Sequence, residues 1–413
     1  MSDRRKLLLI VPTLHQGGQE RVVVRSARLL ADEYDVTIVI FDDSDIGYDT
    51  DGLNIVNLNV PSASLSLFKL INVCRRMVKM RRLKAGLRPD ISYSQGGTAN
   101  IVNCLSSSPS EKTWTSIRCF FDVSDATKIR LYKKRADLIV CCAHDIETQI
   151  RDRYHADKTA TLYNPYDCDE IVADSGQGDP DIDLPETDRL GRHIRYIMAM
   201  GRDDDHKMYW HMLKAFKLIQ VVIPETRLVI LGAGEFESYK RMIRGLGLDD
   251  EVIFTGPQSN PFKYLKRGEV MWMTSRIEGF PNALVEGMAL GLVPVSTNCP
   301  SGPAEILTDG GSVESCAEAF EQMEGNDDLK AIYGEYGVLT PAMTYDRDMD
   351  FAHITEEHFN LAEVMVELLR DPEKMNRYHE AAAKRARDFG YDEYHTRFDE
   401  LVKGSYAQDT VSH

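Results

Sequence analysis

Short apolar runs alternate along the chain with longer segments in which apolar residues recur every three or four positions. In the first third, strand-like runs lie at residues 6–11, 35–41, 53–60, 90–96, 113–118, 136–143 and 160–165. Residues 20–34 and 67–87 between them have helical spacing. Buried strands that alternate with helices predict a parallel sheet covered by helices on both faces.

The pattern breaks at residues 167–193, which are acidic, contain Gly and Pro and show no periodicity. We interpret this segment as a linker between domains plus a surface loop. The alternation then restarts, with strand-like runs at 194–202, 227–234, 251–256, 269–275 and 293–297 and helical segments at 210–222 and 237–248. The expected fold class is α/β, with two Rossmann-like domains that face each other across a cleft and bind ligands at the carboxyl ends of their strands.

Two segments near the end of the chain complete this outline. Residues 310–330 are expected to form an acidic surface helix and loop. A final helix carries five apolar residues on one face and therefore needs a partner surface. These residues are Tyr391, Tyr394, Phe398, Leu401 and Val402.

Composition narrows the classes of function. A chain of 413 residues suits two domains. Its formal net charge of −16 argues against nucleic acid as a partner. Eight cysteines without a C-x-x-C pair argue against a zinc site and are typical of reduced thiols in a cytosolic protein. The apolar run after the basic N-terminus is too short for a signal peptide or a membrane span.

The stretch EGFPNALVE at residues 278–286 has the chemistry of a nucleotide-sugar site. Pro281 is expected to start a helix, and the amides of residues 282–285 at its positive end suit a diphosphate. Glu278, just before the helix, is placed to accept hydrogen bonds from sugar hydroxyls. Glu286, two turns later, suits a ribose diol because two O–H donors meet two carboxylate oxygens. The alternative is a surface helix with two ordinary glutamates.

Two cations, Arg202 and Lys207, follow the first strand of the second half. Fixed cations and helix amides can stabilise a diphosphate leaving group without a metal ion. Three carboxylates at residues 203–205 lie between them and are unfavourable beside a diphosphate. The alternatives are a solvated charged turn and the metal-binding acidic motif of the other major transferase fold.

Glycines mark two further turns. Gly17 and Gly18 follow the first strand, where the lack of side chains lets the backbone approach a phosphate or an acceptor. A tight turn between strand and helix is the alternative. Gly232 belongs to a GAGEFE turn that lacks the third glycine of a dinucleotide fingerprint, so we interpret it as a turn between strand and helix.

The stretch SRIEGFPNALVEGMALGLVPVSTNCPSGPAEIL (residues 275–307) resembles the E-x7-E signature of retaining glycosyltransferases of family four, which have the GT-B fold. TLHQGGQER (13–21), ATLYNP (160–165), MGRDDDHK (200–207) and RLVILGAGEFE (227–237) are similar to other segments of the family. Many similar members build bacterial surface polysaccharides, capsules and lipid-linked oligosaccharides.

The resemblance implies an acceptor domain at 1–170, a linker and surface loop at 171–193, a donor domain at 194–390 and a helix at 391–413 that crosses back to the first domain. It implies metal-independent transfer from a nucleotide-diphospho-sugar, which we expect to be UDP-linked, with no cofactor. The residues expected to act in catalysis are Arg202, Lys207 and Glu278. Those expected to bind the donor are Gly17, Gly18, Gly232, Gly279, Phe280, Pro281, Asn282, Ala283, Leu284, Val285 and Glu286. Those expected near the acceptor are His15, Arg118 and His144, for which ordinary loop or rim residues are the alternative.

The helix at residues 67–88 reverses the charge of the chain locally, because it contains eight basic residues and no acidic one. They are Lys69, Arg75, Arg76, Lys79, Arg81, Arg82, Lys84 and Arg88. Leu67, Leu70, Ile71, Cys74, Met77 and Val78 share one face. One interpretation is a peripheral helix on an anionic lipid surface, which would fit a lipid-linked acceptor. The other is an apolar face that covers the sheet and a basic face in solvent.

Two other functions remain open from the sequence. The same fold supports nucleotide-sugar epimerases, and a third possibility is a nucleotide-sugar-binding protein without catalytic activity. We expect a cytoplasmic protein, either free or peripheral on the inner face of the cytoplasmic membrane. The sequence leaves the sugar, the acceptor and the linkage open.

Overall fold

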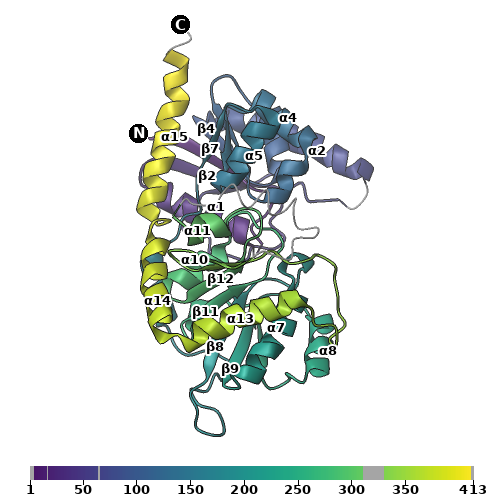
Figure 1. The fold of residues 1–413 in the computed structure, drawn as a ribbon. Helices are drawn as coiled ribbons and strands as arrows, with labels where there is room; N and C mark the ends of the chain where they lie inside the picture. The colour runs from purple at the N-terminus through teal and green to yellow at the C-terminus, as the bar shows by residue number, and fades with distance from the viewer. Residues whose placement is uncertain (1–3, 16, 64–65, 310–329, 411–413) are drawn as a thin grey trace. The chain divides into compact units, whose positions relative to one another are not determined.

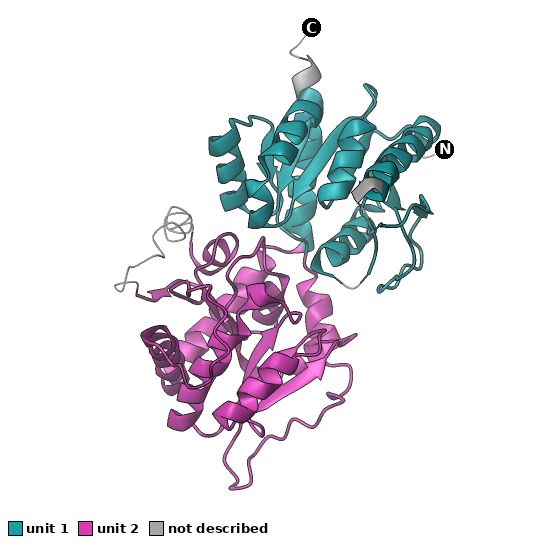
Figure 2. Ribbon diagram, turned by 90° about the vertical axis from the view of Figure 1, so that its right-hand side faces the viewer, with its two compact units in different colours: residues 1–165, 391–413 teal, residues 166–390 magenta. Residues whose placement is uncertain are grey.

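The structure is a computed structural model that describes residues 4–15, 17–63, 66–309 and 330–410. The acidic helix expected at 310–330 falls on residues that lie outside the described ones, except for Lys330. The chain divides into two compact units (Figure 2). Unit 1 comprises residues 1–165 and 391–413, and unit 2 comprises residues 166–390.

Unit 1 contains a seven-stranded parallel sheet with the strand order β3-β2-β1-β4-β5-β6-β7. Its strands are β1 (Arg5–Ile10), β2 (Tyr34–Ile40), β3 (Ile55–Asn57), β4 (Ile91–Ser94), β5 (Lys112–Ile117), β6 (Leu138–Cys141) and β7 (Thr159–Thr161). Its helices are α1 (Gly18–Leu30), α2 (Ser66–Leu87), α3 (Gly97–Leu105), η1 (Phe120–Ser124), α4 (Ala126–Arg135), α5 (His144–Tyr154) and α15 (Tyr391–Thr410).

The central strand β1 shows why its apolar run is continuous. Leu7 and Leu9 belong to one buried cluster, and Leu8 and Ile10 belong to another on the opposite face. Successive side chains of a strand point to opposite faces, so a strand covered on both sides needs apolar residues at every position. The parallel sheet predicted from the alternating pattern is therefore confirmed.

Helix α15 completes the core of unit 1 (Figure 1). Tyr394, Phe398 and Val402 are buried, as the predicted apolar face requires. Phe398 packs against Trp114 of β5 with ring centroids 5.4 Å apart. The hydroxyls of Tyr394 and Ser26 are 2.9 Å apart. The partner surface that the sequence required is thus the sheet and first helix of unit 1.

Unit 2 contains a second seven-stranded sheet, with the order β10-β9-β8-β11-β12-β14-β13, parallel except for β13. Its strands are β8 (Arg195–Met200), β9 (Thr226–Leu231), β10 (Val252–Gly256), β11 (Gly268–Met273), β12 (Val293–Thr297), β13 (Ile332–Tyr333) and β14 (Val338–Thr340). Its helices are α6 (Cys168–Ser175), η2 (Asp205–Lys207), α7 (Tyr209–Val222), α8 (Glu237–Leu246), α9 (Phe262–Leu265), α10 (Asn282–Ala289), α11 (Pro303–Leu307), α13 (Glu356–Arg370) and α14 (Pro372–Arg387). Helices α7 and α13 pack side by side (Figure 1).

The expected linker at 171–193 begins inside a helix, which the sequence analysis missed. Helix α6 is capped by Asp167, whose carboxylate accepts the Glu170 amide at 2.8 Å. Cys168 and Ile171 are buried, and the helix packs against α9 and α10. Two buried apolar residues in a helix of eight are too few for a visible periodicity, and the acidic composition hid the N-terminal capping signal.

Helix α2 does not lie with its apolar face on the sheet, so that interpretation is wrong. The residues of that face that are exposed are Leu70, Ile71, Cys74 and Val78, with Leu70 exposed by 64%. The buried face instead contains Met80, Arg76 and Lys84. Arg76 donates to the Val60 carbonyl at 2.9 and 2.7 Å and lies over the Phe41 ring. Long basic side chains can cover apolar surface with their stems, which the hydrophobic pattern alone does not reveal.

Among the described residues, no helix combines the length and the apolar character needed to cross a lipid bilayer.

Candidate functional site

Three adjacent strands of unit 2 bring Gly232 and the predicted catalytic residues to one edge of its sheet. Strand β8 has β9 on one side and β11 on the other. Arg202 follows β8, Gly232 follows β9 and Glu278 follows β11. Because the strands are parallel, their carboxyl ends meet at the same edge, which is where ligands bind in such sheets.

Lys207 and Glu278 form an ion pair at this edge. Lys207 Nζ lies 2.7 Å from Glu278 Oε1, although the two residues are 71 positions apart. Their side chains are 26% and 14% exposed, so both remain accessible. The structure therefore brings together the cation expected at the diphosphate and the carboxylate expected at the sugar.

The three carboxylates between Arg202 and Lys207 each have a partner within unit 2. Asp203 accepts the Phe236 amide at 2.8 Å, and Asp204 accepts the His206 amide at 2.9 Å and caps η2. Asp205 lies 3.3 Å from Arg347. These contacts explain how an acidic loop can border a site for an anion: its carboxylates are used to fold the loop.

The close approach of two turns requires glycine at position 232. Gly232 has φ +155°, and a Cβ atom there would lie 2.0 Å from the carbonyl oxygen of Gly201. The Asp203 amide donates to the Ala233 carbonyl at 2.9 Å, which joins the same two turns. Gly232 therefore shapes the loop that contains Arg202, and this role does not depend on a contact between Gly232 and a ligand.

Helix α10 begins one residue later than the sequence analysis placed it. Pro281 is the N-cap, with φ −71° and ψ 102°, and Asn282 is the first helical residue. The Leu284 amide donates to the Pro281 carbonyl at 3.1 Å, so this amide is already used within the helix start. The Asn282 side chain accepts the Tyr166 hydroxyl at 2.6 Å. Of the amides predicted to bind the diphosphate, that of Leu284 is therefore bonded within the helix start.

Several predicted donor residues contribute packing rather than an exposed side chain. Phe280 is buried against Phe389, with ring centroids 5.1 Å apart, and Leu284 and Val285 are buried in unit 2. The carbonyl of Gly279 accepts the Ser301 hydroxyl at 2.6 Å. The loop before α10 is thus fixed from both sides, which keeps Glu278 in place.

Glu286 lies on α10 and is 0% exposed. A buried carboxylate is costly unless it is hydrogen-bonded. The role predicted for Glu286 towards a ribose stays a prediction. The structure places it in the middle of α10 (Asn282–Ala289), about one turn after the helix begins.

In unit 1, the predicted acceptor residues follow the carboxyl ends of β1, β5 and β6. Gly17 caps α1, and its amide and carbonyl both bond to the Tyr48 hydroxyl, at 2.9 and 2.5 Å. Gly18 is the first residue of α1. His15 lies 3.8 Å from Glu20. The backbone of the Gly-Gly turn is therefore held by a tyrosine that the sequence analysis did not single out.

Arg118 and His144 occupy neighbouring strand ends. Arg118 follows β5 and donates to the side chain of Asn164. His144 begins α5, is 55% exposed and lies 4.0 Å from Glu147. Strands β5 and β6 are adjacent, so both side chains belong to the same part of the sheet edge.

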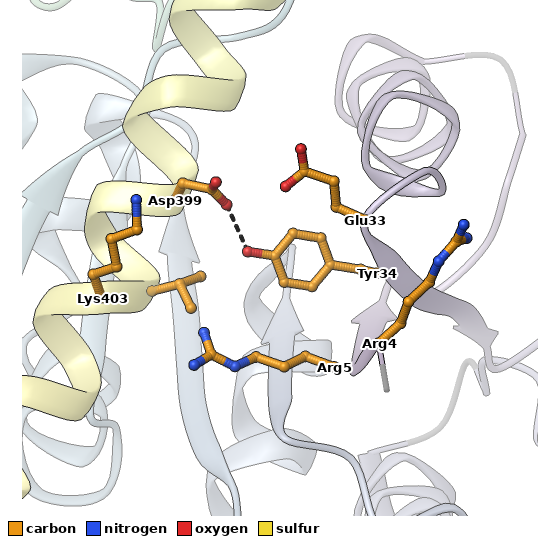
Figure 3. A pocket seen from close by; sticks show the side chains of 7 residues that line it. Arg4, Arg5, Glu33, Tyr34, Asp399 and Lys403 are labelled. Carbon is orange, nitrogen blue, oxygen red and sulfur yellow. Dashed lines mark hydrogen bonds between the residues drawn. The ribbon is translucent and has the colours of Figure 1, made fainter. Parts of the chain in front are cut away.

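A pocket of about 280 Å³ lies elsewhere in unit 1 (Figure 3). It is lined by residues at the beginning of β1 and β2 and on α15, among them Arg5, Tyr34 and Asp399. Tyr34 donates to Asp399 at 2.6 Å, and burial together with this bond raises the pKa of Tyr34. The amino ends of parallel strands are opposite to the edge used for ligands, so this pocket is separate from the predicted site.

One group of side chains among the described residues has the spacing of metal ligands. Glu33, His395 and Asp399 offer one atom each within 4.8 Å of one another. Glu33 and Asp399 line the same pocket in unit 1, at the amino ends of the strands and not at the carboxyl ends that precede the predicted acceptor residues.

Sequence reasoning missed three residues that touch the donor loop. The guanidinium of Arg276 lies 3.5 Å from the centre of the Tyr345 ring, and its amide donates to the His206 carbonyl at 2.8 Å. Arg347 contacts Asp205. Arg276 is within the E-x7-E region, but Tyr345 and Arg347 belong to a segment without periodicity, so no sequence signal indicated them.

Comparison with known proteins places these observations in a family. A model described as Glycosyltransferase Family 4 matches residues 16–170, and one described as Glycosyl transferases group 1 matches residues 192–338. An uncharacterized glycosyltransferase of Methanocaldococcus jannaschii is 28% identical over 284 residues, covering 67% of this chain and 66% of that protein.

Two further proteins are similar over more of their length. One is an N-acetylgalactosamine-N,N'-diacetylbacillosaminyl-diphospho-undecaprenol 4-alpha-N-acetylgalactosaminyltransferase of Campylobacter jejuni, 25% identical over 74% of this chain and 84% of that protein. The other is the crystal structure of Anabaena HepE in complex with UDP and glucose, with a TM-score of 0.68, 16% identity and coverage of 97% and 100% of the two chains. The second likeness shows the fold. Because the two family models match in the order of the two parallel-sheet units, the chain belongs to the family-four glycosyltransferases of the GT-B fold.

Proposed function

We propose that this glycosyltransferase moves a hexose or N-acetylhexosamine from a UDP-linked donor to a saccharide or lipid-linked acceptor in bacterial polysaccharide synthesis, with retention of the anomeric configuration and without a metal ion. The Lys207–Glu278 pair at the carboxyl ends of β8 and β11 carries the proposal. Lys207 offers a cation for the diphosphate, and Glu278 offers carboxylate oxygens that accept hydrogen bonds from sugar hydroxyls. The two side chains are in direct hydrogen-bond contact.

The leaving group is a nucleoside diphosphate whose negative charge grows as the glycosidic bond breaks. Lys207, Arg202 and the first amides of α10 supply positive charge and hydrogen-bond donors where that charge develops. On donor binding, Lys207 Nζ can share its protons between Glu278 and a phosphate oxygen because it carries three donors. Residues of the protein alone therefore account for stabilisation of the leaving group.

Retention follows if the acceptor hydroxyl attacks the face that the diphosphate leaves. The bond from the anomeric carbon to the phosphate oxygen breaks, the bond to the acceptor oxygen forms, and the acceptor proton passes to a phosphate oxygen. Glu278 then orients the sugar by accepting hydrogen bonds from the sugar hydroxyls, while Lys207 holds the Glu278 carboxylate in place. This scheme requires no separate basic side chain.

UDP as the nucleotide and a lipid-linked acceptor are supported by similar proteins. HepE was crystallised with UDP and glucose, and the Campylobacter enzyme is named as acting on a diphospho-undecaprenol-linked saccharide. The test is nucleotide release from UDP-glucose, UDP-galactose, their N-acetylhexosamine counterparts, GDP-mannose and ADP-glucose, each with and without a bacterial lipid extract and with EDTA present.

We expect one UDP-sugar to release UDP, faster with the extract and unchanged by EDTA, and NMR of the product to show the anomeric configuration of the donor. An isomeric UDP-sugar formed without acceptor would instead indicate an epimerase. Tight binding of one donor without UDP release under any condition would indicate a binding protein. A product with the opposite anomeric configuration would overturn the proposed retention, and the rest of the proposed function would stand.

We also propose that the exposed apolar face of α2 rests on an anionic membrane surface. Leu70, Ile71 and Val78 are exposed on this helix, and the basic residues at positions 69, 75 and 82 are exposed beside them. Each basic residue near an anionic surface contributes about 1 kcal/mol. Contact with the membrane would bring the protein close to a lipid-linked acceptor. This contact would place the protein at the inner face of the cytoplasmic membrane.

Vesicle flotation tests this partner. Leu70→Glu with Ile71→Glu should abolish co-flotation with vesicles that contain phosphatidylglycerol, while Val221→Glu on α7, which is equally an exposed apolar position, should have no effect. Equal flotation with purely zwitterionic vesicles, or unchanged flotation of the double variant, would contradict the proposal.

A further inference from the structure

The segment that connects β14 to α13, residues 341–355, is fixed to helix α7 at two buried points. The carbonyl of Thr344 lies 2.7 Å from His211 Nε2, and the carboxylate of Asp348 lies 2.7 Å from Lys214 Nζ. His211 is 3% exposed and Lys214 is 0% exposed. A buried lysine is retained only with a close partner, so the connection at Asp348 is a strong constraint.

Between these two points the segment touches the loop that carries Arg202 and Lys207. The ring of Tyr345 is stacked near the His206 ring, with centroids 6.4 Å apart, and lies against the guanidinium of Arg276. Arg347 lies 3.3 Å from Asp205 and donates to the Ser238 hydroxyl at 3.2 Å. Contacts of residues 345 and 347 therefore hold the turn at 205–207 from one side.

The hydrogen-bond partners of Asp203, Asp204 and Asp205 show why the contact between Arg347 and Asp205 matters. Asp203 and Asp204 are bonded to backbone amides of unit 2, whereas the partner of Asp205 is a side chain from the distant segment. An aspartate that lost its cation would place an unbalanced negative charge two residues from Lys207. That charge would oppose binding of a diphosphate and would compete with it for Lys207.

We infer that Arg347 is a positioning residue for the donor site: it neutralises Asp205 and, with Tyr345, keeps the Arg202–Lys207 loop in the conformation that receives the diphosphate. Residues 341–355 act as a strut, anchored at Thr344 and Asp348. The inference rests on the proposed function for the identity of the ligand, but the strut itself is a property of the free protein.

The first experiment measures UDP binding by calorimetry for Arg347→Ala, Asp205→Asn and the double variant. The ion pair is half exposed, so the expected loss of affinity for Arg347→Ala is about three- to fivefold, and it should shrink at high salt. Asp205→Asn should bind UDP at least as well as the wild type. The double variant should return to within about twofold of the wild type, because no charge is then left unbalanced.

A matched control separates this effect from the general loss of an arginine. Arg387 forms an ion pair with Asp169 at 2.7 Å on the surface of the same unit, away from the donor loop. Arg387→Ala should leave UDP affinity unchanged. In turnover assays, Arg347→Ala should raise KM for the donor with kcat within about twofold, since the residue acts on binding through Asp205.

Hydrogen exchange of the free protein tests the strut without any ligand. Arg347→Ala and Tyr345→Ala should speed the exchange of the amides at 203–207, and Tyr345→Phe, which keeps the ring, should not. Unchanged exchange in both alanine variants would overturn the strut. A double variant that binds UDP as poorly as Arg347→Ala would overturn the charge-neutralising role. If the wild type binds no UDP, the proposed donor fails while the exchange result still decides on the strut.

Discussion

Two lysine–glutamate pairs in this molecule have the same geometry and different surroundings. Lys84 and Glu111 in unit 1, and Lys207 and Glu278 in unit 2, each place nitrogen and oxygen 2.7 Å apart. The first pair is 2% and 1% exposed, and the second is 26% and 14% exposed. Distance alone therefore does not distinguish a structural pair from a pair that can exchange partners with a ligand.

The neighbours of each pair explain the difference. Lys84 also bonds to Ser92 and Asn103, so the donors of its ammonium group are fully used. Burial lowers the pKa of Lys84, and the charge of Glu111 opposes that shift. Among the described residues, the side chain of Lys207 bonds to Glu278, which precedes α10. An incompletely used cation at a strand end is available for an anionic substrate.

The largest effect expected from this comparison is on folding. Lys84→Met should lower the free energy of unfolding by about 3–5 kcal/mol, because Glu111 would remain buried without its cation. Chemical denaturation measures the loss. Combining Lys84→Met with Glu111→Leu should recover most of it, and a double variant as unstable as the single one would show that the pair is not what stabilises this region.

The exposed pair should affect turnover instead. Lys207→Ala, and likewise Arg202→Ala, should reduce kcat by about 10²–10³-fold, the usual scale for loss of one preorganised donor to a developing negative charge. The free energy of unfolding should change by less than about 1 kcal/mol, since the pair is accessible to water. Near-normal turnover in both variants would refute the assignment.

Unit 2 has its own buried polar contact, and it should respond to pH. His211 Nδ1 lies 2.9 Å from His358 Nε2, and Lys214 and Asp348 adjoin the pair. Burial lowers the pKa of His211 to about 4 and that of His358 to about 3. For His358 the charge of neighbouring groups adds to the shift, whereas the Thr344 carbonyl and Asp348 partly oppose it for His211.

The sign of the effect follows from proton uptake. Below a pH of about 6.5 the unfolded histidines bind protons that the folded ones do not, so stability falls as pH decreases towards 4. For His211 alone the loss is on the order of 3 kcal/mol. Denaturation at pH 7 and pH 4.5 should show it, and His211→Asn should reduce the difference. A pH dependence that is identical in this variant would contradict the assignment.

The smallest effect concerns a third glutamate, which resembles Glu111 in burial and Glu278 in position. Glu286→Gln keeps the shape of the side chain and should weaken UDP binding about tenfold, the scale of a hydrogen bond to a charged group. Turnover at saturating donor should change little. If UDP affinity is unchanged and stability falls instead, Glu286 belongs with Glu111 as a structural residue.

Much of the fold and part of the candidate site could be predicted from the sequence. Most strands of both sheets followed from apolar runs that alternate with helices, because a strand buried on two faces is largely apolar. The short strands β13 and β14 were not predicted. The Glu278 loop and Arg202 were found because residue types and spacing carry their chemistry. Arg347 and Tyr345 were not, because they reach the site through a distant segment without hydrophobic periodicity; Arg347 and Asp205 are 142 positions apart.

Two helices, α2 and α6, were predicted incorrectly for different reasons. In α2 the buried face includes Arg76 and Lys84, whose stems pack while their charged ends bond to a carbonyl and to Glu111. A pattern that counts every basic residue as exposed assigns the wrong face. In α6 a short helix with an aspartate cap was hidden by acidic residues on its solvent side.

The return of the chain to unit 1 sets an order of events during synthesis. Residues 1–165 and 391–413 form one unit, so the ribosome must make all of unit 2 before Phe398 can reach Trp114. Unit 2, by contrast, is continuous and can fold as soon as residue 390 has emerged. The first part of the chain therefore waits with an apolar surface uncovered while the later part matures, and a nascent chain is most exposed to chaperones and proteases in that interval.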